Sequence, residues 1–199
     1  MLITSKSKME LDRLKALLSS EFEMKDLGEA KKILGMEITK DRVASTVCLT
    51  QTQYLKKVLQ RFDIDEKTKP VSTPLAPHFQ LSALMSPSTT DEKKQMERVP
   101  YANAVGALMY AMVCTRPDIS HAVSIVSRYM HNPGKGHWQA VKWILRYIYG
   151  TVDIGLKFER DKTEGKHLVG YVDSDYAGDL DKRRSTTGYV FTMAGGSVC

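Results

Sequence analysis

The chain has 199 residues, which is enough for one medium domain or for one small domain and part of another. Hydrophobic residues make up 42% of the sequence, and the net charge of +6 suits a polyanionic partner without requiring one. No apolar run approaches the roughly 20 residues that span a bilayer, and no apolar signal-peptide core follows Met1. We therefore expect neither membrane insertion nor secretion.

The three cysteines, Cys48, Cys114 and Cys199, are too widely spaced for a zinc site of the Cys-x-x-Cys type. An odd number of cysteines without a secretion signal indicates a reducing compartment. We interpret Cys48 and Cys114 as small apolar residues of the core.

The first predicted element is a helix over residues 8–22. Ser7 and Glu10 have the spacing of a capping box at its start. Leucines then recur at helical spacing along one face: Leu11, Leu14, Leu17 and Leu18.

A β-hairpin is predicted next. Leu34, Met36 and Ile38 alternate with more polar residues, which is typical of a half-buried strand. Residues 41–45 would form the turn, and residues 46–49 the returning strand.

A second helix and a proline-rich stretch follow the hairpin. Thr50 can cap the helix, whose apolar stripe consists of Leu55, Val58, Leu59 and Phe62. Five of the seven prolines then lie between Pro70 and Pro100. Because proline blocks helix propagation and central-strand pairing, residues 69–99 predict a linker or extended loop, with a short helix at 91–98.

Three helices are predicted between this linker and residue 150. Residues 115–118 (TRPD) place a proline near the first turn of the second helix, and residues 132–134 (NPG) end it. The third helix runs from about 136 to 149. The expected core positions of the three helices are Ala102, Val105, Leu108, Met109 and Met112, then Ile119, Ala122, Val123, Val126, Tyr129 and Met130, then Val141, Ile144, Leu145 and Ile148.

From residue 154 onward the pattern favours β-structure. Strands are predicted around 168–172 and 188–193, with a turn at 195–196. No helix follows that could cover these strands, and a sheet with one uncovered apolar face is not a finished domain. We therefore expect the last domain to be truncated.

Three segments in this order resemble the polymerase region of copia-type long-terminal-repeat retrotransposons. The first is LGEAKKILGMEI at 27–38. The second, within 101–155, contains VGALMY, TRPDI and HWQAVK. The third, at 170–189, contains GYVDSDYAGD and RSTTGY.

This resemblance implies an α+β fold in four parts. Residues 1–68 would be the end of a reverse transcriptase palm with a primer-grip-like hairpin, and 69–100 a linker. Residues 101–155 would be thumb or connection helices, and 156–199 the first strands of a truncated ribonuclease H-like sheet. The paired aspartates that bind two Mg²⁺ ions in family polymerases lie immediately before a segment like Met1–Ile3, so we expect no polymerase activity from this chain alone.

The resemblance also places Asp173 where ribonuclease H has its first metal-binding carboxylate, with Asp175 as a second candidate ligand. Mg²⁺ prefers such hard oxygen ligands, but the family's partner carboxylates come from later elements. We therefore expect an incomplete site and no nuclease activity. We interpret Asp179 and Asp181 as part of a solvated turn beside a basic run.

Two groups are candidates for contact with nucleic acid. The resemblance assigns Leu34, Gly35 and Met36 to the primer grip, with sheet core as the favoured alternative for the apolar side chains. Lys142 and Arg146 share a helical face among aromatic residues, which suits a phosphate backbone. Ordinary solvated cations remain the alternative for this pair, and core packing remains the alternative for Trp138 and Trp143.

The expected partners are a primer–template duplex or RNA–DNA hybrid and the remainder of the Pol polyprotein. The parent would use Mg²⁺ to copy RNA into DNA and to degrade the RNA strand, in a cytoplasmic virus-like particle or in the nucleus. Two other interpretations stay open for this chain: a non-catalytic nucleic-acid-binding module retained from a transposon, and an inert translated relic.

Overall fold

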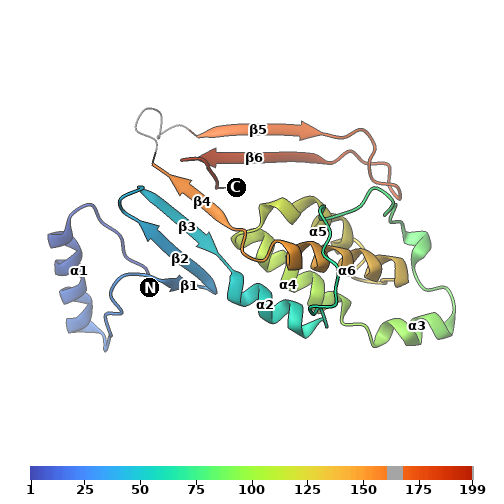
Figure 1. Ribbon diagram of the computed structural model, residues 1–199, viewed down its shortest axis with the longest axis horizontal. Helices are drawn as coiled ribbons and strands as arrows, with labels where there is room; N and C mark the ends of the chain where they lie inside the picture. The colour runs from blue at the N-terminus through green and yellow to red at the C-terminus, as the bar shows by residue number, and fades with distance from the viewer. Residues whose placement is uncertain (161–167, 199) are drawn as a thin grey trace.

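The computed structural model describes residues 1–160 and 168–198, and it mixes helices and sheets in an α+β arrangement (Figure 1). The helices are α1 (Lys8–Glu21), α2 (Thr52–Arg61), α3 (Thr90–Glu97), α4 (Tyr101–Cys114), α5 (Ser120–Ser127) and α6 (Lys135–Gly150), with short 3₁₀ turns at Ala83–Met85 and Pro117–Ile119. The strands are β1 (Lys32–Ile33), β2 (Met36–Asp41), β3 (Thr46–Thr50), β4 (Leu156–Glu159), β5 (Val169–Ser174), β6 (Thr187–Met193) and β7 (Gly196–Ser197). The mixture of helices and sheets confirms the predicted α+β class.

Helix α1 stands apart from the rest of the fold at the N-terminal end (Figure 1). It begins as predicted, because the Ser7 side chain accepts a hydrogen bond from the Glu10 backbone at 3.4 Å. None of its residues is buried, and Leu14 and Leu17 are exposed. Its apolar stripe is therefore without a partner among the described residues.

The first sheet has the strand order β1-β2-β3-β4, and all neighbours are antiparallel. The predicted hairpin is present, but Leu34 lies in the turn between β1 and β2 rather than in a strand, and its side chain is 74% exposed. The expectation of a core position for Leu34 is therefore wrong. Leu34 and Gly35 form the two-residue turn that joins β1 to β2, so β2 begins only at Met36.

Strand β4 begins at the predicted boundary, residue 156, and joins the first sheet. It pairs with β3, with Leu156 opposite Leu49 and Glu159 opposite Thr46. Strand β3 would otherwise present unpaired backbone groups along its edge, and β4 satisfies them. Gly155 permits this close approach, because a Cβ atom there would lie 2.2 Å from the Leu49 carbonyl oxygen. Residues 156–159 thus belong to the hairpin sheet.

The main core lies among α2, α4, α5 and α6. The predicted stripes of α2 and α6 are buried, as are Ile119, Ala122, Val123 and Val126. The face of α4 is turned from the predicted one: Ala104 and Ala111 are buried, whereas Met109 is 41% exposed. Small residues face the core here because α4 packs closely against its neighbours.

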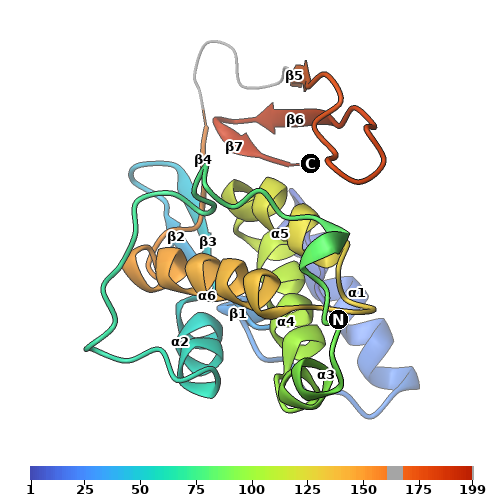
Figure 2. The same cartoon turned by 90° about the vertical axis from the view of Figure 1, so that its right-hand side faces the viewer.

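The proline-rich stretch is extended, with the expected short helix as α3, but it is packed rather than free. Leu81 and Met96 are buried, and Leu81 belongs to the main core. The stretch from Asp63 to Thr89 thus forms a strap across the helices (Figure 2). Cys48 and Cys114 are only half-buried.

The second sheet has the order β5-β6-β7 and lies above the helices in Figure 2. These strands and their turn match the predicted segments. All residues of β5 are exposed. The predicted unit 156–199 also includes residues 161–167 and Cys199, which lie outside the described residues. No helix in the described part of the chain is long and apolar enough to cross a bilayer.

Candidate nucleic-acid interface

The turn between β1 and β2 is exposed yet held firmly in place. Leu34 and Gly35 have φ values of 47° and 75°, the pattern of a tight hairpin turn. The Tyr110 hydroxyl of α4 donates a hydrogen bond to the Leu34 carbonyl. A Cβ atom at Gly35 would lie 3.7 Å from the same hydroxyl oxygen, while Met36 is half-buried at the start of β2. The helical block thus braces the tip of the hairpin.

Helix α6 presents a cationic outer face. It contains three basic residues and no acidic residue. Lys142 is exposed, and its Nζ lies 5.7 Å from the centre of the Trp138 ring. The Arg146 Nε donates to the Lys69 carbonyl oxygen at 2.8 Å, and its guanidinium lies 5.1 Å from the centre of the Trp143 ring. Arg146 is therefore oriented by the strap, with further N–H donors available for a ligand.

Both tryptophans belong to packing clusters, as the alternative interpretation held. Trp138 packs against the main core beside Phe62 and Tyr101. Trp143 is half-buried, and its Nε1 donates to the Thr73 carbonyl oxygen at 2.9 Å. Trp143 thus fastens the strap to α6 and leaves part of its ring accessible.

The strap and α6 together line a cavity of about 450 Å³ that is open to solvent on one side. Gly136, Gln139, Trp143 and Arg146 line it from α6 at steps of three and four residues, which is one helical face. His78, Phe79, Leu81 and Met85 line it from the strap, and Lys142 completes the lining. The two predicted cations therefore share one concave surface.

Asp173 and Asp175 lie at the end of β5, as the sequence predicts. Asp173 pairs opposite Gly188 of β6, and its Oδ1 accepts a hydrogen bond from the Ser174 backbone at 2.9 Å. The Asp175 Oδ1 accepts one from the Thr186 backbone. Over residues 1–160 and 168–198, no three His, Cys, Asp or Glu side chains converge as a metal site.

This donor set does not fit a pair of Mg²⁺ ions. Two bridged ions need several converging carboxylates. Here two aspartates each have an oxygen engaged by a backbone amide. We therefore assign no catalytic step to them.

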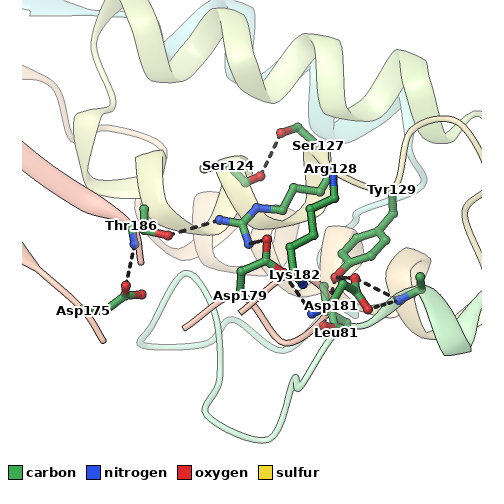
Figure 3. A network of polar contacts seen from close by, with 11 residues as sticks. Leu81, Ser124, Ser127, Arg128, Tyr129, Asp175, Asp179, Asp181, Lys182 and Thr186 are labelled. Carbon is green, nitrogen blue, oxygen red and sulfur yellow. Dashed lines mark hydrogen bonds and ion pairs between the residues drawn. The ribbon is translucent and has the colours of Figure 1, made fainter. Parts of the chain in front are cut away.

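The loop between β5 and β6 is exposed to solvent, but polar contacts anchor it to the strap and to the end of α5 (Figure 3). The Asp181 carboxylate accepts hydrogen bonds from the Ala83 backbone, at 2.9 and 3.0 Å, and lies 3.0 Å from the Tyr129 hydroxyl. The Asp179 carboxylate pairs with Arg128 at 3.6 Å, and its side chain is only 13% exposed. The Asp179 side chain is therefore largely covered, contrary to the interpretation as part of a solvated turn, whereas Asp181 is exposed to solvent as expected and is also hydrogen-bonded to the strap.

Charge and burial shift the pKa values of Tyr129 and Asp179, which belong to these contacts between the loop and the helices. Burial, followed by the hydrogen bond to Asp181, raises the pKa of Tyr129 to about 12. Hydrogen bonds from the backbone of Lys182 and Asp181, together with the charge of Arg128, hold the pKa of Asp179 below its usual value. Near neutral pH, Tyr129 therefore stays protonated and Asp179 stays ionised.

The predicted site residues fall into three groups on separate elements: the β1–β2 turn, the outer face of α6 and the end of β5. The sequence analysis did not predict three residues that contact these groups. Tyr110 contacts the β1–β2 turn, and His78 and Phe79 lie beside the outer face of α6. Tyr110 lies 76 residues from Leu34 in sequence, and the strap aromatics meet α6 only through tertiary packing. No local pattern could have indicated these contacts.

Comparison with known proteins supports the reverse transcriptase resemblance. Residues 1–77 match the family described as reverse transcriptase (RNA-dependent DNA polymerase). The retrovirus-related Pol polyprotein from transposon TNT 1-94 of Nicotiana tabacum is 54% identical over 198 residues. The match covers 100% of this chain but only 15% of the tobacco polyprotein.

Two shorter proteins are also similar. Secreted RxLR effector protein 161 of Plasmopara viticola is 52% identical over 103 residues, which are 52% of this chain and 71% of the effector. Uncharacterized mitochondrial protein AtMg00810 of Arabidopsis thaliana is 37% identical over 188 residues, which are 94% of this chain and 73% of that protein. No solved structure matches the chain significantly.

Proposed function

The chain belongs to the family of retrotransposon Pol polyproteins, and we propose that it serves there as a support for a primer–template duplex and not as a catalytic centre. The parent polyprotein would carry out RNA-directed DNA synthesis and degradation of the RNA strand. Residues 1–68 would supply the end of the palm with the primer grip, and α4–α6 the thumb or connection. Strands β5–β7 would begin the ribonuclease H-like sheet.

The observation that carries this proposal is the braced turn at Leu34 and Gly35. A duplex backbone is best supported by rigid, exposed main-chain groups that do not read bases. The turn is exposed at Leu34, while Tyr110 fixes it from the helical block. Lys142 and Arg146 add positive charge on α6 for phosphate contacts.

The test is equilibrium binding of an RNA–DNA hybrid to the full chain over a series of salt concentrations. Each phosphate contact should contribute about −0.9 to the slope of log K against log salt. Replacing Lys142 and Arg146 together by glutamine should reduce the slope by about two contacts. Lys157→Gln is the matched control, since Lys157 is an exposed cation on β4 that pairs with Glu159. A slope unchanged in the double variant would contradict the assignment of this face.

Catalysis is tested separately by Mg²⁺-dependent cleavage of the RNA strand in the same hybrid. The chain alone should cleave no faster than background, because Asp173 and Asp175 are too few to hold two ions. Asp173→Asn serves as the control. Robust turnover that disappears in Asp173→Asn would overturn this expectation.

The remainder of the polyprotein is the proposed protein partner. We propose this partner because the chain corresponds to only 15% of the tobacco polyprotein that it resembles. The exposed residues Leu14 and Leu17 of α1, together with Phe22 directly after the helix, offer apolar surface for that partner. Mixing the chain with a segment that extends the polyprotein should therefore reduce binding of a hydrophobic dye. An inert relic would bind the dye equally with and without that segment.

A further inference from the structure

The cavity beside α6 has an aromatic wall. The Trp143 ring centre lies 5.5 Å from that of His78 and 5.6 Å from that of Phe79, both in edge-on geometry. The ring centres of His78 and Phe79 lie 4.4 Å apart. Because the Trp143 Nε1 donates a hydrogen bond to the Thr73 carbonyl oxygen of the strap, the Trp143 ring is held in place before any ligand binds.

The rim of the same cavity is cationic. Lys142 and Arg146 both line it, and none of its described lining residues is acidic. Gln139, on the same helical face, can offer both a donor and an acceptor to a polar ring edge. The volume of about 450 Å³ lies within the range of roughly 300–1,000 Å³ that small-molecule sites usually have.

We propose that this cavity binds one unstacked base of a single-stranded nucleic acid, with the adjoining phosphate against Lys142 and Arg146. This rests on the proposed function and deepens it, because the template strand of a primer–template is single-stranded beyond the primer end, and α6 would hold one base of that strand beside the duplex. Aromatic faces with nearby cations are the usual means of holding single strands, since every base has a face that can stack. A proline-rich peptide also uses aromatic grooves, but two rim cations favour an anionic ligand.

The probes are a short oligothymidylate and an abasic oligonucleotide of the same length, each titrated into the full chain. The two carry equal numbers of phosphates and differ only in their bases. The oligothymidylate should bind more tightly and should quench tryptophan fluorescence. Replacing His78 and Phe79 together by alanine should weaken its binding by about 5- to 100-fold, the usual contribution of one stacked base. The same change should leave binding of the abasic probe unaltered.

Two further variants distinguish a loss of stacking from a loss of folding. Phe79 packs against the main core, so His78→Ala alone tests an exposed ring of the cavity. Tyr176→Ala is the matched control, because Tyr176 is an aromatic side chain that is 96% exposed and lies outside the cavity. We expect a loss of oligothymidylate affinity in His78→Ala and none in Tyr176→Ala.

The outcomes separate the two proposals. Equal affinity for both probes, or an unchanged affinity in the cavity variants, overturns the base pocket and leaves phosphate binding by α6 intact. Displacement of the oligothymidylate by a proline-rich peptide at lower concentration also overturns the pocket assignment. Absence of salt-dependent binding to either probe and to the hybrid overturns the proposed function, and the base pocket with it.

Discussion

Arg116 is a charged residue whose side chain is wholly buried. Its Nε and Nη2 donate to the two oxygens of Asp118 at 2.9 and 2.8 Å, and its Nη1 and Nη2 donate to the carbonyl and hydroxyl oxygens of Thr151 at 2.9 and 2.7 Å. Burial tends to raise the pKa of Asp118, but the bonds and charge of Arg116 outweigh it and lower that pKa. Through Arg116, the turn before α5, which contains Asp118, is connected to Thr151 at the end of α6.

Replacing Arg116 by methionine should reduce the free energy of unfolding by about 3 kcal/mol, because Asp118 and Thr151 lose their partner in a partly buried site. Urea unfolding provides the measurement. Arg42→Met is the control, since Arg42 pairs with Glu29 while 85% exposed, and should change stability by no more than about 0.5 kcal/mol. Equal effects of the two substitutions would show that the buried network contributes nothing specific.

His137 should make stability fall on acidification. Its Nδ1 accepts from the Gly134 backbone at 2.9 Å, and its Nε2 lies 3.0 Å from the Ser82 carbonyl oxygen, so the buried ring is neutral. Burial lowers its pKa below 6.5, against the opposing effects of Ser82 and Asp181. The unfolded chain therefore binds the proton first, and stability is complete above pH 6.5 and declines below it.

The measurement is the free energy of unfolding between pH 7.5 and 5.5, where one such group changes it by at most about 1.4 kcal/mol per pH unit. His137→Gln should show a shallower decline than the natural chain. Identical slopes would mean that folding does not lower the pKa of His137. The sequence alone did not predict this buried role of His137, because a helical pattern does not reveal that the Ser82 carbonyl lies beside the ring.

At the scale of elements, the β1–β2 turn depends on backbone conformations that most residues avoid. Gly35 has a φ of 75°, whereas Gly106 in α4 has an ordinary helical backbone and open space around it. Gly35→Ala should therefore destabilise the protein by about 1–2 kcal/mol, and Gly106→Ala should stabilise it by up to about 1 kcal/mol. Thermal unfolding of the two variants, which differ only in the position of one added methyl group, decides this. Stabilisation by both would show that the turn is not left-handed.

Elements with a clear period were predictable, and elements defined by a distant partner were not. The stripes of α2 and α6 identified their buried faces, because burial of a helix follows from its own spacing of apolar residues. Leu156–Glu159 has a strand-like sequence, yet nothing in it specifies β3 as its neighbour. The same holds for the candidate site: the sequence placed Lys142 and Arg146 on one helical face, but it did not show that the strap forms the other wall of their cavity.

At the scale of the whole molecule, the second sheet is joined to the helices by the anchored loop and by β4. The Glu159 backbone donates to the Ala194 carbonyl oxygen at 2.8 Å, in the turn before β7. The Tyr129 hydroxyl lies within hydrogen-bonding distance of both the Leu81 carbonyl and Asp181. These contacts connect the second sheet, the strap and the end of α5, so these three parts should unfold together.

Asp181→Ala should weaken that connection by about 1–3 kcal/mol, because it leaves the Ala83 amide and the Tyr129 hydroxyl without this acceptor. Hydrogen exchange would show it as faster exchange in β5–β7 with little change in α4 and α6, since the helices keep their own core. Asp153→Ala, at an exposed aspartate after α6, is the control and should leave exchange in the sheet unaltered. Combining Asp181→Ala with Tyr129→Phe should cost less than the sum of the two single changes, since both remove the same contact. Strict additivity, or uniform acceleration across the molecule, would show that the loop does not couple the sheet to the helices.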